Sequence, residues 1–270
     1  MRERIFISAI WVAAVLALLF FAPKWVLAAI VTVIIAMAMF EFFTMIQRKQ
    51  LPVYPYFGII IGCIIPISTY LKFDPTQGWE FLLITTVCLS IFLLQFTKRR
   101  IDNATSGIAI TIFAIFYISW FFSFLVKILV SDLIVPDGRM LLLFLLIVTK
   151  VGDAGAYFFG KLLGAHHLIP RISPKKSIEG AIGGFLCSFI AAFLCARFVP
   201  QLELVHIAVL GTLLGILGQI GDLSESLIKR DCMVKDSSAV FAGLGGMLDL
   251  IDSLLFTSPI FYFYIRFLSQ

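Results

Sequence analysis

The chain has 270 residues, of which 61% are apolar and only 14% are charged, and its formal net charge is +5. Its mean hydropathy of +1.04 is far above that of a soluble domain. This composition excludes a soluble globular protein and predicts an all-α, polytopic integral membrane protein. The excess of basic residues suits anionic membrane lipids, and nothing in the sequence indicates a nucleic-acid partner.

The apolar runs predict about nine transmembrane helices, because each span needs about 20 residues to cross about 30 Å of hydrocarbon. In chain order the predicted spans are residues 5–22, 25–46, 56–72, 80–97, 105–130, 141–160, 178–198, 205–225 and 248–268. The first run resembles a signal peptide, but Pro23 and a second apolar run follow at once, so we expect it to be retained as a helix.

The basic residues between these spans predict the orientation of the chain. Of the 21 Lys and Arg, fourteen fall on one side of a nine-span bundle, six fall on the other, and Lys150 lies within a span. The six exceptions are Lys24, Lys72, Lys127, Arg139, Arg197 and Arg266. Since cytoplasmic loops carry the excess of Lys and Arg, we expect a protein of the cytoplasmic (inner) membrane with its N-terminus in the cytoplasm and its C-terminus outside.

The two parts of the chain differ in character. Residues 1–140 form plain apolar spans and predict a transmembrane scaffold, in which Glu41 is expected at headgroup level rather than in a catalytic role. Residues 141–270 contain polar breaks and predict the catalytic region. From Asp153 onward their charges lie toward the predicted cytoplasmic ends of the spans, which predicts a polar, cytoplasm-facing cavity.

Four Asp, two Lys and one Arg interrupt the apolar sequence between residues 226 and 252. An ionised side chain near the bilayer centre costs roughly 2.5–3.5 kcal/mol on insertion scales, so such a cluster indicates a function. Asp249 and Asp252 are three residues apart, as are Asp222 and Glu225, and each pair therefore projects from one helix face. Converging carboxylates suit Mg²⁺, and their density also allows a second cation. The alternative is that these acids only pair with nearby cations.

Basic residues surround this acidic centre in the sequence. They are Lys175, Lys176, Lys229, Arg230 and Lys235. Such a pattern fits a phosphorylated anion, because nucleotidyl transfer mainly requires positioning and neutralisation of charge. Gly245 and Gly246, just before Asp249, are expected to offer backbone N–H groups to a phosphate at a helix N-terminus. For Lys175 and Lys176 an ordinary positively charged loop is the alternative.

These residues resemble the phosphatidate cytidylyltransferases, also called CDP-diacylglycerol synthases. The C-terminal signature of that family is matched in register by Ser226, Lys229, Arg230, Lys235, Asp236, Ser238, Phe241, Gly245, Gly246, Asp249 and Asp252. The segments DAGAYFFGKLLG (153–164), ISPKKSIEGAIGG (172–184) and GDLSES (221–226) are also similar. Three positions depart from the signature: Ala242 replaces Pro, Leu244 replaces His and Leu250 replaces Arg. The N-terminal half is similar by hydropathy alone.

The resemblance implies an enzyme that transfers the CMP moiety of CTP to phosphatidic acid and releases pyrophosphate, with Mg²⁺, at the cytoplasmic face. The catalytic residues are then Asp222, Lys229, Arg230, Lys235, Asp236, Asp249 and Asp252. The substrate-binding residues are Lys175, Lys176, Ser226, Gly245 and Gly246, and the metal ligands are Asp222, Asp249 and Asp252. The resemblance also suggests a homodimer.

Two other functions fit parts of the pattern. A CTP-dependent prenol or dolichol kinase would share the membrane setting and the nucleotide, but it would release CDP instead of pyrophosphate. A cation or nucleotide transporter would also contain buried acids, but it is expected to show inverted repeats with a site at the membrane midplane. The sequence contains no convincing repeat, and its charges gather toward one side.

Overall fold

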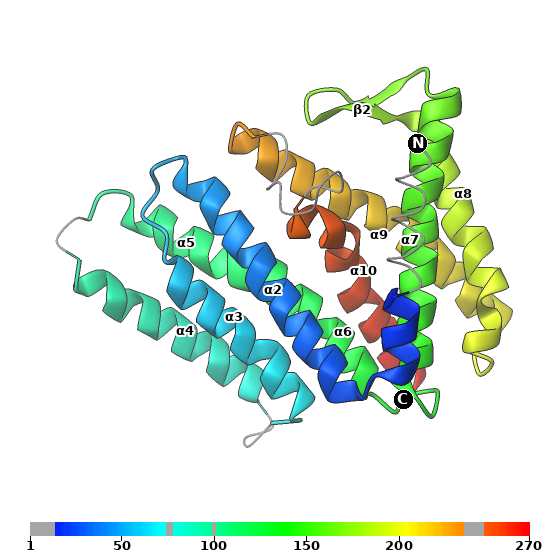
Figure 1. Ribbon diagram of the computed structural model, residues 1–270, viewed down its shortest axis with the longest axis horizontal. Helices are drawn as coiled ribbons and strands as arrows, with labels where there is room; N and C mark the ends of the chain where they lie inside the picture. Colours follow the sequence, from blue (N-terminus) through cyan, green and yellow to red (C-terminus); the bar gives the residue numbers. More distant parts are fainter. Residues whose placement is uncertain (1–13, 74–77, 99–100, 235–245) are drawn as a thin grey trace.

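The structure is a computed structural model that describes residues 14–73, 78–98, 101–234 and 246–270. Residues 14–21 are helical. The elements that follow are α2 (Lys24–Gln47), α3 (Pro55–Tyr70), α4 (Trp79–Phe96), α5 (Ala104–Ala114), the π-helical η1 (Ile115–Trp120), α6 (Phe121–Val130), α7 (Gly138–Leu163), β1 (His167–Ile169), β2 (Ser173–Ser177), α8 (Ile178–Leu194), the 3₁₀ turn η2 (Ala196–Phe198), α9 (Leu204–Asp231) and α10 (Met247–Leu268). The protein is therefore predominantly helical, as its sequence predicts (Figure 1).

Where the structure describes them, the helices begin and end within four residues of the predicted spans, except that α9 continues six residues beyond its predicted end. Six of them are long and apolar enough to cross a membrane, with α5, η1 and α6 forming a single continuous helix. Two others, α3 and α8, are apolar but have only 16 and 17 residues. The described residues thus establish six potential membrane-crossing helices, and the full number of nine remains a prediction.

A small β-hairpin is an addition that the all-α prediction did not contain. Strands β1 and β2 pair antiparallel between α7 and α8, where the sequence indicates only a short loop. The Ser177 hydroxyl accepts a hydrogen bond from the Gly180 N–H at 3.1 Å and caps the start of α8. Glu179 accepts hydrogen bonds from the backbone N–H groups of Ala165 and His166, at 3.1 and 3.2 Å. The hairpin is therefore held against the first turn of α8.

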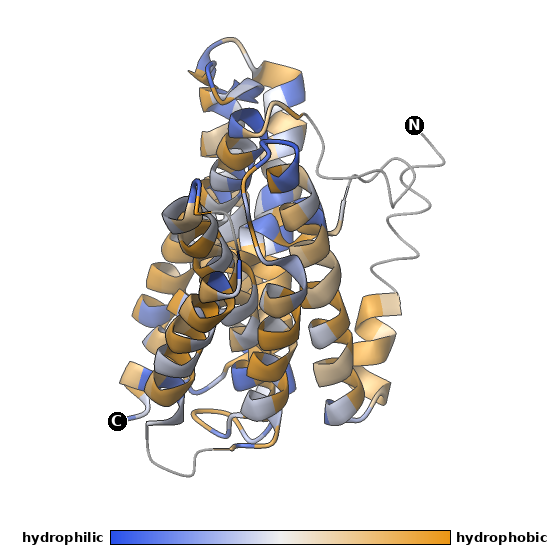
Figure 2. Ribbon diagram, turned by 90° about the vertical axis from the view of Figure 1, so that its left-hand side faces the viewer, coloured by the Kyte–Doolittle hydropathy of each residue, from blue (hydrophilic) through white to orange (hydrophobic). Residues whose placement is uncertain are grey.

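Helix α10 occupies the centre of the molecule (Figure 1). It packs against α7 and α9 on one side and against α2 and α6 on the other. Buried apolar residues such as Phe42 of α2 and Phe144 of α7 belong to one hydrophobic cluster that crosses the predicted boundary between residues 140 and 141. Figure 2 shows hydrophobic residues along most of the helical surface and many hydrophilic residues toward the end that carries the hairpin.

Candidate functional site

The site forms where α9 and α10 approach each other closely. A Cβ atom at Gly221 would collide with the backbone carbonyl group of Asp252. Only glycine therefore lets the two backbones come this near. One turn earlier, a Cβ atom at Gly218 would lie 3.8 Å from Cβ of Ser253, which is an ordinary contact. The consequence of the approach at Gly221 is that Asp222 of α9 lies next to Asp252 of α10.

Three carboxylates from these two helices converge. Asp222, Glu225 and Asp252 each place one oxygen atom within 4.8 Å of the others. The Glu225 side chain is only 1% exposed, and its Oε2 atom lies 2.5 Å from Nζ of Lys229. Clustered carboxylates that are removed from water are costly unless cations balance their charge. Three oxygen donors of this kind fit a hard divalent cation such as Mg²⁺.

Two lysines form ion pairs with this carboxylate cluster. Lys176 of the hairpin places Nζ 2.8 Å from Oδ2 of Asp222. Lys229, one helical turn after Glu225, places Nζ 2.5 Å from Oε2 of Glu225 and also contacts Asp249 of α10. The predicted end of this helix, near residue 225, was too early, because α9 continues to Asp231 and carries Lys229 on its last turns. The extended helix brings Lys229 directly to the acids.

A second polar cluster joins α7 to α10 beside the carboxylates. Lys150 donates hydrogen bonds to Oδ2 of Asp153 at 3.0 Å, to Oγ of Ser253 at 2.9 Å and to the carbonyl oxygen of Leu250 at 3.0 Å. Ser253 in turn donates to Oδ2 of Asp153 at 2.8 Å. Ser253 follows Asp252 directly, so this cluster fixes the part of α10 that carries the third carboxylate. The sequence pattern drew attention to Lys150 and Asp153 but not to Ser253.

The first turn of α10 is held by two acidic side chains. Asp249 accepts a hydrogen bond from the Gly246 N–H at 2.7 Å. Glu41 of α2 accepts hydrogen bonds from the N–H groups of Met247 and Leu248, both at 2.9 Å. Such groups have no partner within their own helix. Glu41 is only 3% exposed and caps α10, so it is packed inside the protein, and its expected position at headgroup level stays a prediction. No local sequence signal indicates a contact across about 200 residues.

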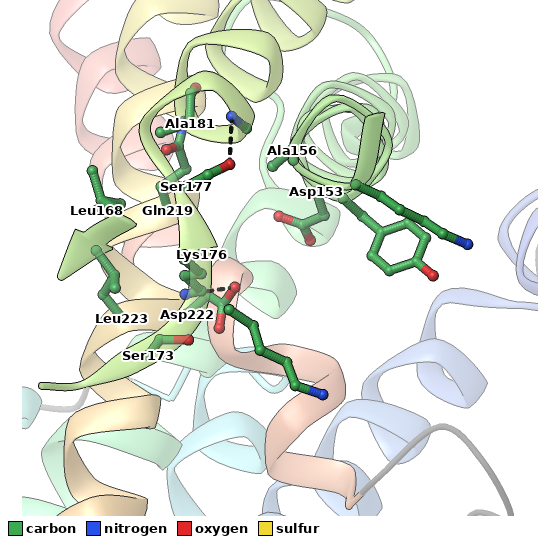
Figure 3. A pocket seen from close by; sticks show the side chains of 15 residues that line it. Asp153, Ala156, Leu168, Ser173, Lys176, Ser177, Ala181, Gln219, Asp222 and Leu223 are labelled. Atoms are coloured by element: carbon green, nitrogen blue, oxygen red, sulfur yellow. Dashed lines mark hydrogen bonds and ion pairs between the residues drawn. The ribbon is translucent and has the colours of Figure 1, made fainter. Parts of the chain in front are cut away.

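A cavity of about 490 Å³ opens beside the carboxylates. It lies between the hairpin and helices α7, α8 and α9, and Figure 3 shows Asp153 facing the Lys176–Asp222 ion pair across it. Lys175 and Lys161 also line it. Two of the predicted phosphate-binding residues, Lys175 and Lys176, therefore border the same space as the predicted metal ligand Asp222.

The remaining predicted site residues occupy several positions. Arg230 donates a hydrogen bond from Nε to the carbonyl oxygen of Ile172 at 3.2 Å, which ties the end of α9 to the hairpin. Ser226 is half-buried on α9, and Gly246 is the N-cap of α10. Three further candidates lie outside the described residues: Lys235, Asp236 and Gly245. The structure thus brings Asp222 and Asp252 together with Glu225, and it pairs Asp249 with Lys229.

The fold and the site define a helical membrane protein with a carboxylate cluster bordered by lysines, an arrangement typical of enzymes that act on phosphate groups. The sequence profile of the cytidylyltransferase family matches residues 2–268, almost the whole chain. The chain therefore belongs to the cytidylyltransferase family and is a nucleotidyltransferase.

Individual relatives agree with this assignment. A phosphatidate cytidylyltransferase of Thermotoga maritima is 34% identical over 249 residues, covering 90% of this chain and 88% of the relative. A phosphatidate cytidylyltransferase of Bacillus subtilis is 28% identical over 271 residues, covering 100% of this chain and 99% of the relative. The uncharacterised protein YnbB of Escherichia coli is 31% identical over 249 residues, covering 91% of this chain and 80% of that protein.

Proposed function

We propose that this protein transfers the CMP moiety of CTP to phosphatidic acid, which gives CDP-diacylglycerol and pyrophosphate. The observation that carries the proposal is the convergence of Asp222, Glu225 and Asp252 beside a lysine-lined cavity in a helical membrane protein. Two relatives, matched over 88% and 99% of their length, bear the name phosphatidate cytidylyltransferase. A carboxylate cluster beside lysines suits a nucleoside triphosphate that enters from water and a lipid that stays in the membrane.

The reaction requires a phosphate oxygen of phosphatidic acid to attack the α-phosphorus of CTP. A new phosphorus–oxygen bond forms there, the bond between the α-phosphorus and its bridging oxygen breaks, and pyrophosphate leaves. No general base is needed, because a phosphate monoester is already ionised near pH 7. The protein therefore has to position the two anions and to neutralise their charge.

In this proposal the carboxylates hold the metal and the lysines hold phosphate. Mg²⁺ bound to Asp222, Glu225 and Asp252 would supply positive charge to the nucleotide phosphates. Asp249 remains a predicted ligand, since it lies three residues before Asp252 on α10. The number of carboxylates in this region also allows a second cation. Lys175 and Lys176 border the cavity, where they are placed to attract the triphosphate.

We propose that the hairpin end of the molecule faces the cytoplasm. Lys161, Arg171, Lys175, Lys176 and Arg230 all belong to this end, and positively charged segments remain cytoplasmic. CTP would then reach the cavity from the cytoplasm, and phosphatidic acid would enter from the inner leaflet. The predicted homodimer is retained as part of the proposal, and its test is the mass of the purified protein in detergent.

The test of the function is product analysis with purified protein. Phosphatidic acid, CTP labelled in its cytidine and Mg²⁺ are expected to give labelled lipid and one pyrophosphate for each lipid formed. A chelator of divalent cations is expected to stop the reaction, and added Mg²⁺ to restore it. Release of CDP from CTP together with phosphorylation of an alcohol acceptor would indicate a kinase instead, and the absence of labelled lipid at every metal concentration would contradict the proposal.

A further inference from the structure

A second cavity, of about 700 Å³, lies at the end of the molecule opposite the hairpin. Its walls come from the end of α3, the start of α4, the end of α6 and the end of α10. Figure 1 shows the C-terminus, which follows α10, at the opposite end from β2. This cavity is therefore separate from the carboxylate cluster and its lysines.

The basic residues of this cavity are exceptions to the charge distribution of the whole chain. Among the six Lys and Arg that fall on the predicted outer side, Lys72, Lys127 and Arg266 line this one cavity. They come from three different helical regions of the sequence. Basic residues are disfavoured on that side of a membrane protein, so their gathering in one place indicates a specific use.

The other three exceptions have local structural explanations. Lys24 forms an ion pair with Asp137 at 3.3 Å. Arg139 donates hydrogen bonds to the carbonyl oxygens of Leu19, Phe20 and Ala22, at 3.0, 2.8 and 2.8 Å. The guanidinium group of Arg197 lies 5.0 Å from the ring centre of Phe198. Of the three residues that line the cavity, Lys127 has such a contact, an ion pair with Glu80, whereas Lys72 and Arg266 form no ion pair with the described residues.

The described residues that line the cavity include more cations than carboxylates. Lys127 forms an ion pair with Glu80, whereas no ion pair joins Lys72 or Arg266 to a carboxylate of the described residues. Lys72 and Arg266 are therefore the lining cations that are available to a bound anion.

The cavity also has the amphipathic walls that a lipid requires. Its lining includes the aromatic residues Trp79, Trp120 and Tyr262, and indole and phenol side chains favour the boundary between headgroups and hydrocarbon. Apolar side chains such as Ile65 and Phe263 complete the wall. A volume of this size lies within the range of small-molecule sites, about 300–1,000 Å³.

We propose that this cavity binds the headgroup of an anionic phospholipid from the leaflet at that end of the molecule. Lys72 and Arg266 bind the phosphate, because ammonium and guanidinium groups make charge-assisted hydrogen bonds to phosphate oxygens. The aromatic and apolar walls hold the glycerol backbone and the first part of the acyl chains. A free phosphate would share the ionic contacts but would leave these walls without a partner.

The test is native mass spectrometry of the full-length protein with phosphatidylglycerol or phosphatidylcholine, without CTP or Mg²⁺. We expect phosphatidylglycerol to bind at least about fivefold more tightly, since one basic residue near a membrane contributes about that factor. K72Q/R266Q is expected to lose this preference. K24Q/R197Q removes the same charge at the same end outside the cavity and is expected to keep the preference, as is K72R/R266K.

Three results would overturn the assignment. The first is equal binding of the two lipids, and the second is an equal loss of preference in K72Q/R266Q and K24Q/R197Q. The third is displacement of phosphatidylglycerol by millimolar glycerol phosphate, because that result would indicate a site for soluble anions. Should K72Q/R266Q be polydisperse, the single variants K72Q and R266Q are compared in its place. Because binding is measured without CTP, this result is independent of the proposed cytidylyl transfer.

Discussion

Glu41 of α2 accepts a hydrogen bond from the backbone N–H of Leu248 at 2.9 Å, although the two residues are 207 positions apart. Its second oxygen accepts the N–H of Met247. A carboxylate at a helix N-terminus satisfies donors that have no partner in the helix and interacts favourably with the helix dipole. The first turn of α10, which carries Asp249, is therefore positioned by a residue from the predicted scaffold.

Replacing Glu41 is expected to affect stability and catalysis together. Glu41→Ala leaves two buried N–H groups without an acceptor, at a cost of about 1–3 kcal/mol for each unsatisfied group. We expect a lower melting temperature in detergent and a lower rate of cytidylyl transfer. Glu41→Gln keeps one oxygen acceptor and is expected to fall between Glu41→Ala and the wild type. An alanine variant with unchanged stability and rate would show that Glu41 does not position α10.

Gly221 and Gly218 offer a matched pair of alanine substitutions on one face of α9. Gly221→Ala forces a methyl group against the carbonyl of Asp252, and overpacking of this kind typically costs about 1–3 kcal/mol. Because the helices must separate there, we expect Gly221→Ala to lose Mg²⁺-dependent transfer. Gly218→Ala meets its nearest neighbour, Thr149, at 3.6 Å and is expected to stay active. Equal rates for the two variants would argue against the close approach.

Glu225 is expected to bind metal although the family signature did not single it out. Glu225→Gln keeps the shape of the side chain and removes its charge. We expect the transfer rate to fall by roughly 10²–10³, as for the loss of a central electrostatic group. We also expect a smaller rise in melting temperature on addition of Mg²⁺, since stabilisation follows the affinity of the bound ion. Ser224→Ala is the control, because the Ser224 hydroxyl donates its hydrogen bond to the Ile220 carbonyl of its own helix. An unchanged Mg²⁺ response in Glu225→Gln would remove Glu225 from the metal site.

The helices were predictable because their signal is local. Apolar runs such as residues 25–46 and 248–268 identify α2 and α10 to within two residues, since a membrane-crossing helix satisfies its own backbone hydrogen bonds. The spacing of Asp222 and Glu225 likewise predicts that they share a face. The family signature added Asp252 as a partner for Asp222, and the structure brings the two together.

The contacts between distant segments were not predictable in this way. The capping of α10 by Glu41 and the ion pair between Lys176 and Asp222 depend on tertiary packing, and no periodicity encodes them. The hairpin was missed because its strands have only three and five residues and contain Pro174, which disfavours a strand. The contact of Ser253 with Lys150 and Asp153 also joins distant segments, so no local pattern indicated it.

Lys150 of α7 contacts the turn of α10 in which Leu250 replaces the signature arginine. Its Nζ atom lies 3.0 Å from the carbonyl oxygen of Leu250, so α7 brings a cation to the backbone of this turn.

We expect Lys150→Leu to reduce the transfer rate by about tenfold or more, because removing one charge-assisted hydrogen bond costs about 1.5–3 kcal/mol. The double variant K150L/L250R, which moves the cation to α10, is expected to recover part of that loss. L250R alone, which adds a second cation, serves as the control for the effect of the new side chain. Initial rates at saturating Mg²⁺ measure all three variants. A double variant no faster than Lys150→Leu would show that the lysine acts through Asp153 and Ser253 rather than as a replacement for the arginine.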